Sequence, residues 1–258
     1  MTIRQPIKGA AAFSKTIAVL QLIADSENPI ASAELVKKTG MPRPTMRRIL
    51  KALIAEDMVE LGPNKTFTLG ARHIEFARKS LDQNSLLRTV SADLGRLSDE
   101  TDSSVCLGVP LGIEFIVIAE NGASQATVGS TGPYNACAIA KAYLAFVPDD
   151  RREKIIDSIE MPSLTEHTTT CRDRLRAELK QTAADGYSVS DQQLRIDEKW
   201  LGACVVDAKT TPCAGIGLSM KRSQTDAARE SKYLSALLQC RDRINQKLQQ
   251  VKFECSPP

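Results

Sequence analysis

A run of basic side chains between residues 43 and 51 offers the clearest chemistry in this sequence. Five basic or polar residues lie there on the outer sides of an expected helix: Arg43, Thr45, Arg47, Arg48 and Lys51. The inner side is apolar because the i, i+3, i+4, i+7 positions are Met46, Ile49, Leu50 and Leu53. Arginine pairs bidentately with guanine edges or phosphates, and a major groove accepts an α-helix. The pattern indicates a DNA-reading helix, with a solvated surface helix as the alternative.

The residue types that carry catalysis or bind metals show no comparable pattern. Seven cysteines, at positions 106, 137, 171, 204, 213, 240 and 255, form no C-x-x-C pair and have no histidine at zinc-site spacing. His73 and His167 stand among polar neighbours without a nucleophile beside them. We expect reduced thiols of a cytoplasmic protein, with no cofactor and no metal. A cysteine-dependent hydrolase is the enzymatic alternative, although no cysteine has a candidate base beside it.

The basic helix needs neighbours that hold it in place, and the preceding sequence predicts them. Residues 14–24 predict a helix with Ser14 as its N-cap. The apolar stripe expected on this helix consists of Ile17, Leu20 and either Ile23 or Ala24. Residues 32–38 predict a second helix, and Gly40, Met41 and Pro42 interrupt the chain after it. Pro44 suits the first turn of the third helix, so the three together predict a helix-turn-helix.

Two short strands follow the third helix. Residues 58–61 and 66–69 alternate apolar and polar side chains on either side of a turn at residues 62–65. A hairpin after three helices predicts a winged helix-turn-helix, and Lys65 at its tip would meet the phosphate backbone. A hairpin that only covers the core is the structural alternative.

The charge of the chain is concentrated in this first part. Residues 1–82 hold 13 Lys and Arg against 8 Asp and Glu, a net +5, whereas the remainder carries a net −2. A polyanion partner requires such a surplus near its binding helix. No stretch approaches the roughly 18 apolar residues of a membrane span, and the N-terminus lacks a signal-peptide core. We therefore expect a soluble protein with no membrane partner.

The rest of the chain predicts an α+β domain with a largely antiparallel sheet. Residues 71–82 predict a linker helix between a DNA-binding domain, 1–70, and a second domain, 83–258. Helices are expected from residue 84 or 85 and at 136–146, 150–159, 172–185 and 223–250, with Gly186 as a C-terminal cap. Strands are expected at 105–109, 113–119, 126–128, 187–189, 200–206 and 213–218.

These residues resemble the IclR family of transcriptional regulators over almost the whole chain. The family's Gly-Leu-Pro-Lys-Ser-Thr-x-x-Arg pattern is similar to residues 40–48, and its strand ending Tyr-x-Leu-Gly resembles residues 67–70. Its Pro-Leu-His-Ala-Thr-Ala-x-Gly-Lys-Ala segment resembles residues 133–142, and its Leu-x-x-Glu-Leu and Gly-Tyr positions resemble 175–179 and 186–187. The resemblance implies a winged helix-turn-helix, a GAF- or PAS-like effector domain and a homodimer or homotetramer. It also implies a double-stranded DNA operator and a small-molecule effector, commonly an organic or aromatic acid.

An effector site is expected around the start of the helix near residue 135, whose free N–H groups favour a carboxylate. The residues expected to bind the effector are Gly129, Ser130, Asn135, Cys137, Ser190, Trp200, Cys204, Gly217 and Ser219. The chain departs from the family at Asn135, Cys137 and Ala140, where His, Thr and Gly are usual, and at Gln193 and Asp197, where Glu and Gly are usual. Trp200 stands where a small residue typically faces the ligand.

Three alternatives remain open, two for the second domain and one for the whole protein. Trp200 either reshapes the site for a different ligand or fills it and leaves a scaffold. The small residues around it either line a pocket or let the helix and strands pack closely. A protein-interaction module, in which the helix-turn-helix serves only dimerisation, is the third reading.

Overall fold

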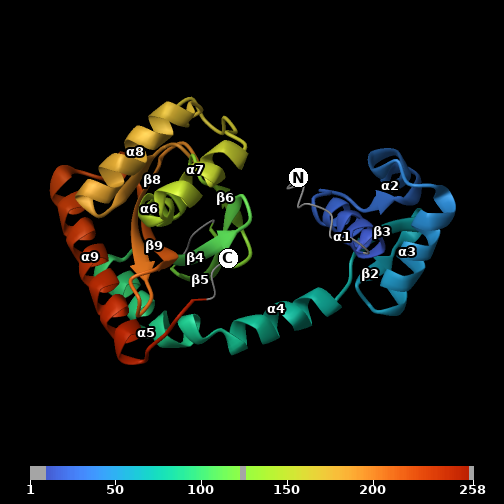
Figure 1. Ribbon diagram of the computed structural model, residues 1–258, viewed down its shortest axis with the longest axis horizontal. Coiled ribbons are helices and arrows are strands. Elements are labelled where there is room, and N and C mark those ends of the chain that lie inside the picture. The colour runs from blue at the N-terminus through green and yellow to red at the C-terminus, as the bar shows by residue number, and fades with distance from the viewer. Residues whose placement is uncertain (1–9, 123–125, 256–258) are drawn as a thin grey trace. The chain divides into compact units, whose positions relative to one another are not determined.

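The structure of the protein is a computed structural model that describes residues 10–122 and 126–255. The chain divides into two compact units, Met1–Gln83 and Asn84–Pro258 (Figure 1). Each has a hydrophobic core of its own. No helix among the described residues is long and apolar enough to cross a membrane.

The first unit is a winged helix-turn-helix. Its elements are α1 (Ala11–Ala24), β1 (Ile30–Ala31), α2 (Ser32–Thr39), α3 (Arg43–Ala55), β2 (Val59–Leu61), a 3-10 turn (Pro63–Lys65), β3 (Thr66–Leu69) and α4 (Arg72–Gln83). The strands form an antiparallel sheet in the order β1-β3-β2. Leu35 of α2 and Met46 and Leu50 of α3 pack in one core with Val59 and Phe67 of the wing. The apolar stripe predicted for the basic helix is therefore what attaches it to its unit.

Two details of the first helix were predicted wrongly. Helix α1 begins at Ala11 rather than near Ser14, and its N-cap, Ala10, makes no side-chain hydrogen bond. Ile17 is 45% exposed, whereas Val19 is fully buried together with Ile23. The N-cap was wrong because the helix starts earlier than predicted. The buried face was wrong because apolar spacing alone does not decide which side of a helix meets the core.

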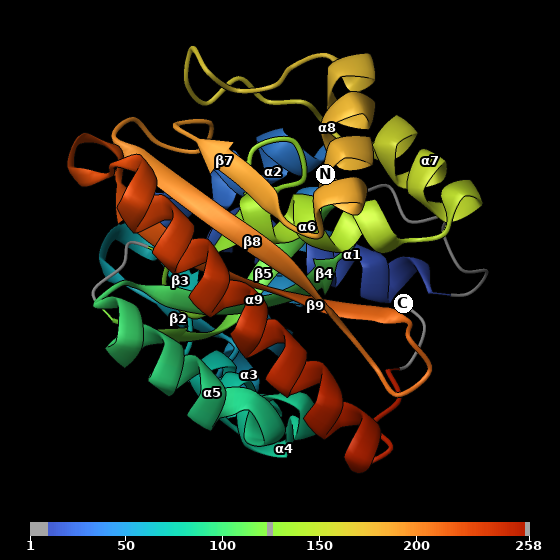
Figure 2. The ribbon, with the colours of Figure 1, turned by 90° about the vertical axis from the view of Figure 1, so that its left-hand side faces the viewer.

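The second unit is built on a six-stranded antiparallel sheet in the order β6-β5-β4-β9-β8-β7, which confirms the predicted α+β class. The strands are β4 (Val105–Leu111), β5 (Glu114–Asn121), β6 (Thr131–Pro133), β7 (Ser188–Asp191), β8 (Glu198–Val206) and β9 (Pro212–Lys221). The helices are α5 (Ser85–Thr101), α6 (Ala138–Phe146), α7 (Asp149–Ser158), α8 (Arg172–Asp185) and α9 (Ala227–Gln250). Helices α5 and α9 pack together against one face of the sheet (Figure 2).

Helix α6 lies on the other face, and glycines in the sheet allow its close approach. A Cβ atom on Gly215 would stand 2.4 Å from the carbonyl oxygen of Ile139, and one on Gly202 would stand 2.7 Å from the carbonyl of Ala138. Distances below 3 Å cannot be tolerated without movement of one backbone against another. The alanine-rich sequence of α6 and these glycines together place the start of the helix directly on the central strands.

Several strands and helices of this unit begin or end at other residues than predicted. Residues 126–128 are not a strand; the edge strand is β6, which begins after Gly129 turns the chain with φ +90°. Helix α9 begins at Ala227, where the carboxylate of Asp226 caps it, and a 3-10 turn occupies Arg222–Gln224. Gly186 is confirmed as the left-handed C-terminal cap of α8, with φ +79°.

Candidate nucleic-acid interface and effector cavity

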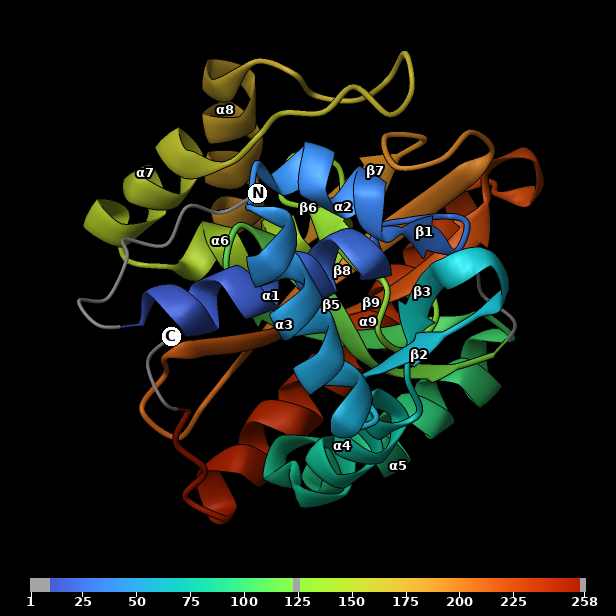
Figure 3. The same ribbon diagram turned by 90° about the vertical axis from the view of Figure 1, so that its right-hand side faces the viewer.

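The turn between α2 and α3 fixes the direction of the basic helix. Gly40 ends α2 in the left-handed conformation, with φ +67°. The hydroxyl of Thr39 donates to the carbonyl of Leu35 at 2.7 Å and accepts from the backbone N–H of Met41 at 3.3 Å. The extended backbone of Pro42 then starts α3. Figure 3 shows α2, α3 and the β2–β3 hairpin of this unit facing the viewer.

The outer side of α3 carries cations that the rest of the unit leaves free. Arg43, Arg47, Arg48 and Lys51 are exposed, and Thr45 is half-buried. None of the four cations takes part in an ion pair within the described part of the chain. An exposed cation without a carboxylate partner can bind a phosphate without first breaking an ion pair.

The wing carries the remaining predicted contact, Lys65. Its backbone, like that of Asn64, has a φ of +58°, and the side chain is exposed at the tip of the hairpin. The turn is closed by the N–H of Gly62, which donates to the carbonyl of Thr66 at 2.8 Å, and by the Thr66 hydroxyl, which donates to the carbonyl of Pro63. Lys65 is thereby presented on a defined turn.

Polar contacts tie the start of α4 to the end of α3. The guanidinium of Arg72 lies 2.9 Å from the carboxylate of Glu75 and 3.6 Å from that of Asp57. A ring nitrogen of His73 is 2.9 Å from the carbonyl oxygen of Met58. A Cβ atom on Gly70 would stand 2.1 Å from the carbonyl oxygen of Asp57, so only glycine fits at the end of the wing. The ring of His73 is thus held by the backbone at Met58, which is a structural role.

In the second unit, a cavity of about 60 Å³ lies between the start of α6 and the sheet. Four of the nine residues predicted to bind an effector line it: Ser130, Cys137, Ser190 and Trp200. Its other walls are mainly apolar and include Cys106, Phe115, Val117, Ile139 and Leu194. A volume of this size holds a few water molecules and is far below the roughly 300 Å³ of a small-ligand pocket.

The other five predicted residues lie outside the lining. Asn135 is fully buried, and its side-chain nitrogen donates to the carbonyls of Pro162 and Thr169 at 3.0 and 2.8 Å. Gly217 is a packing position, because a Cβ there would meet Ile139 at 2.5 Å. Gly129 forms a turn.

The last two are on the strands. Ser219 stands opposite Trp200 in the β8–β9 register, and its N–H donates to the carbonyl of Ser104. Burial raises the pKa of the Cys204 thiol to about 12, so this cysteine stays protonated.

The polar groups at the cavity are mostly bonded within the protein. The hydroxyl of Ser190 donates to the carbonyl of Ala136 at 2.6 Å, and that of Ser130 donates to the carbonyl of Thr127. Cys137 is the N-cap of α6, and burial raises the pKa of its thiol although backbone N–H groups of α6 oppose the shift. The indole nitrogen of Trp200 donates to Glu198 at 3.2 Å.

Arg195 is a lining residue that sequence reasoning missed. Its Nη1 atom is buried, lies 3.6 Å from Glu198 and has no hydrogen bond within the described structure. It is also the only charged residue among those that the described structure places around the cavity. The one signal in the sequence was a charged side chain between two apolar ones, Leu194 and Ile196.

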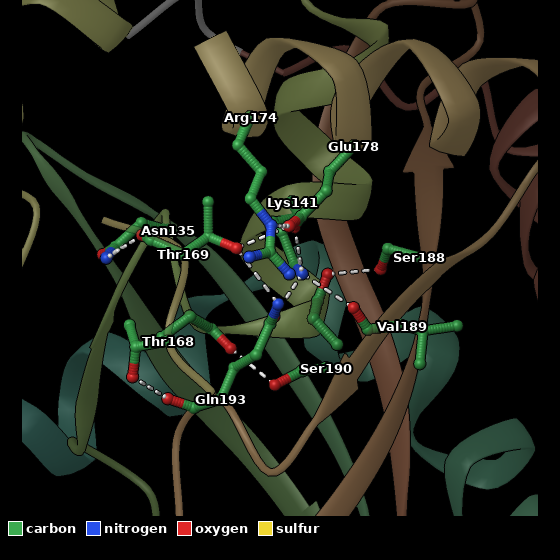
Figure 4. Close-up of polar contacts among 12 residues, drawn as sticks. Asn135, Lys141, Thr168, Thr169, Arg174, Glu178, Ser188, Val189, Ser190 and Gln193 are labelled. Atoms are coloured by element: carbon green, nitrogen blue, oxygen red, sulfur yellow. Dashed lines mark hydrogen bonds and ion pairs between the residues drawn. The ribbon is translucent and has the colours of Figure 1, made fainter. Parts of the chain in front are cut away.

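A second hollow, of about 270 Å³, lies beside α8 and β7, and Lys141 forms part of its wall. Lys141 is only 1% exposed, and its ammonium donates to Glu178 at 2.9 Å, to the carbonyl of Val189 at 2.7 Å and to Gln193 at 2.6 Å (Figure 4). An ammonium has three donors, so none is left for a ligand. Gln193, which departs from the family's Glu, accepts one of the three.

The two hollows differ in the charged residues around them. Burial lowers the pKa of Lys141, and the charge of Glu178 opposes this shift. Burial acts to raise the pKa of Glu178, but Lys141 and the Thr169 hydroxyl outweigh it, so the net pKa of Glu178 is lowered. With the ammonium already paired, the other charged residues around this hollow are Asp185 and Asp191, which repel an acid. The cavity beside Trp200 and Arg195 therefore suits an anion better.

Comparison with known proteins connects both units to one family. Residues 12–63 match the model of the IclR helix-turn-helix domain, and residues 78–246 match that of the bacterial transcriptional regulator IclR C-terminal domain. The transcriptional repressor IclR of Escherichia coli (strain K12) is 26% identical over 214 residues, which cover 80% of this chain and 78% of the repressor.

Solved structures share the fold along nearly the whole chain. An IclR family transcriptional regulator from Brucella abortus matches with a TM-score of 0.79 and 18% identity, over 95% of both chains. An IclR homologue from Microbacterium hydrocarbonoxydans, solved in complex with 4-hydroxybenzoate, matches with a TM-score of 0.75 and 16% identity, over 93% of this chain and 100% of that chain.

Proposed function

The chain belongs to the IclR family of bacterial transcriptional regulators. We propose that it binds its DNA operator through α3 and the wing, and that a small organic acid either releases the protein from the operator or recruits the protein to it. In this proposal, residues 1–70 form the DNA-binding domain, 71–82 the linker, and 83–258 the domain for effector binding and oligomerisation. The observation that carries the proposal is the set of exposed, unpaired cations on α3.

The proposed DNA contacts are Arg43, Thr45, Arg47, Arg48, Lys51 and Lys65. Arg47, Arg48 and Lys51 project from the side of α3 opposite the buried Met46 and Leu50. A helix placed in a major groove presents this side and its N-terminal turn to base edges, while a wing reaches the phosphates. The local net charge of +5 supports the same partner.

A gel-shift assay tests this assignment with a DNA fragment selected from genomic DNA by the unmodified chain. We expect Arg47→Ala and Arg48→Ala each to weaken binding by about 1–3 kcal/mol. The matched control is Arg78→Ala, because Arg78 is an exposed arginine of α4 that pairs with Asp82. Log affinity should fall with log salt at a slope of about −0.9 per phosphate neutralised. Unchanged affinity of the Arg47/Arg48 double variant would overturn the assignment.

The proposed effector is a small acid bound in the Trp200 cavity. The homologue from Microbacterium hydrocarbonoxydans was solved with 4-hydroxybenzoate, an aromatic acid. The apolar walls of the cavity and its lining residue Arg195 suit the same chemistry. Because the cavity is smaller than such a ligand needs, binding requires movement of a wall.

The proposed assembly is a homodimer or homotetramer. The first unit exposes large apolar side chains on α1 and α4: Phe13, Ile17, Ile74 and Phe76. We propose these side chains as the interface between subunits, and a symmetric dimer could read two half-sites roughly 34 Å apart. Light scattering should detect a lower mass for Phe76→Ser than for the control Val128→Ser, which changes an exposed residue of the other unit. Equal masses would exclude α4 from the interface.

The enzymatic alternative receives no support from the cysteines around the sheet. Burial raises the pKa of Cys106, Cys204, Cys213 and Cys240, which disfavours the reactive thiolate. No group of three or more His, Cys, Asp or Glu residues in the described ranges is arranged to hold a metal ion. Selective alkylation of one cysteine well below pH 8.5 would revive a cysteine enzyme.

A further inference from the structure

Trp200 limits the size of the cavity, and the side chain of Glu198 holds the indole nitrogen of Trp200 in place. The residue is only 5% exposed, and its ring forms one wall. Its indole nitrogen donates to Glu198 Oε2, two residues earlier on β8. A rotation of Trp200 would enlarge the cavity, but it would break this hydrogen bond to a carboxylate. The carboxylate of Glu198 therefore controls how readily the wall moves.

In the described part of the chain, Arg195 pairs with the same oxygen of Glu198. The 3.6 Å separation between Arg195 Nη1 and Glu198 Oε2 is an ion pair without a hydrogen bond. A buried guanidinium N–H without an acceptor is costly, and a bidentate carboxylate satisfies it with two parallel hydrogen bonds. Arg195, which lines the cavity, thus has a buried donor without an acceptor, while Oε2 of Glu198 accepts from Trp200 and also pairs with Arg195.

From this geometry we infer that Arg195, Glu198 and Trp200 form a gate that a ligand carboxylate opens. The inference rests on the proposed effector function and adds the residues and the order of events. The ligand carboxylate binds Arg195 in place of Glu198. Glu198, released from Arg195, turns toward solvent, which its partly exposed side chain already reaches. Trp200 then loses its fixed acceptor and swings aside, and the apolar part of the ligand takes the space.

The charges around the cavity favour an anion over a cation or a neutral ligand. Arg195 is the one charged residue among the described residues of the lining. The N-terminus of α6 opens on the same cavity at Cys137, where its partial positive charge adds to that of the guanidinium. A neutral amide of the same shape cannot replace Glu198 at Arg195 with comparable strength, because the pair would lose its charge. The gate should therefore discriminate by charge.

The test uses the full chain with benzoate and its neutral isostere, benzamide, and follows the emission of Trp200, the single tryptophan. We expect benzoate to change the emission saturably and benzamide to have at least tenfold weaker effect. Arg195→Gln should weaken benzoate binding at least tenfold. The side chain of Arg195 is 40% exposed, so this variant should fold, which its melting temperature checks.

A second variant separates a gate from a merely structural role. Glu198→Gln keeps an acceptor for the indole but removes the charge that competes for Arg195, so benzoate should bind more tightly than to the unmodified chain. Arg176→Gln, a change on α8 where the arginine pairs with Glu153 of α7, is the control and should leave binding unchanged.

Three results would overturn the gate. These are full benzoate affinity in Arg195→Gln, weaker binding in Glu198→Gln, or no response of the unmodified chain to benzoate in either emission or melting temperature. In the first two results benzoate still binds, so the proposed effector function stands without the gate. The third result contradicts effector binding as well, and the gel shift tests operator binding separately from all three.

Discussion

Replacement of Lys141 by methionine should destabilise the second unit by about 3–5 kcal/mol. Methionine has nearly the length and volume of the lysine stem, so packing is retained and the ammonium alone is lost. Its loss leaves Glu178, Gln193 and the carbonyl of Val189 without the donor that each now accepts from. An unsatisfied buried acceptor costs about 1–3 kcal/mol, and more when it is charged. The loss is a large part of the roughly 5–15 kcal/mol that stabilises a domain.

Urea unfolding followed by tryptophan emission measures this change in the correct unit. Trp200 is the only tryptophan and lies in the second unit, so its signal reports that unit's transition in the full chain. With a denaturant slope of about 1–3 kcal/mol per molar, the midpoint should fall by about 1–5 M. The control is Lys154→Met, which changes an exposed lysine of α7 and should leave the midpoint nearly unchanged.

A double-variant cycle tests the cause. Glu178→Gln alone leaves the buried ammonium of Lys141 without its carboxylate, so it should also be destabilising. The two changes together remove both charges and should cost less than the sum of the two single changes. An unchanged midpoint for Lys141→Met, or strictly additive costs, would refute the argument that this ion pair fastens α6 to α8.

Two further predictions concern pH and the wing. Because the pKa of Glu178 is lowered in the folded state, its contribution is present above the unfolded value of 4.5 and is lost as pH falls through the folded pKa; urea midpoints measured between pH 6 and 3 should fall less steeply in Glu178→Gln, and parallel curves would contradict this. Gly70→Ala should destabilise the first unit by about 1–3 kcal/mol or more, because its Cβ would lie 2.1 Å from the carbonyl oxygen of Asp57. Melting followed by circular dichroism checks it against Gly62→Ala, whose Cβ would stand 3.3 Å from the Thr66 hydroxyl oxygen; equal melting temperatures would contradict it.

One departure from the family acquires a structural meaning. Asp197 stands where the family usually has glycine, and its backbone has a φ of +60°, a region that glycine enters without strain. Its carboxylate accepts hydrogen bonds from the N–H and the hydroxyl of Ser223 at 2.8 and 2.9 Å. These bonds offset the conformational cost.

The sequence by itself determined the elements whose signals are local. The spacing of Met46, Leu50 and Leu53 and the break at residues 40–42 predicted α3 and its buried face, and Gly186 predicted the end of α8. Helix periodicity, caps and turns depend on residues within a few positions of one another, so one chain displays them. The same reasoning missed β1, because two residues carry no periodic pattern and Ile30 becomes a strand only by pairing with Phe67.

Only the tertiary structure decided which of the expected effector residues meet at one cavity. Gly217 and Asn135 suggested a pocket by their types, yet one lets α6 approach the sheet and the other fastens the segment containing Pro162 and Thr169. Arg195 had no pattern to mark it, and Lys141 finds Gln193 across 52 positions of sequence. Such contacts depend on how distant segments pack, and burial then determines whether a charge is free or already paired. The basic helix was therefore predictable from its own residues, whereas the chemistry of the cavity required the fold.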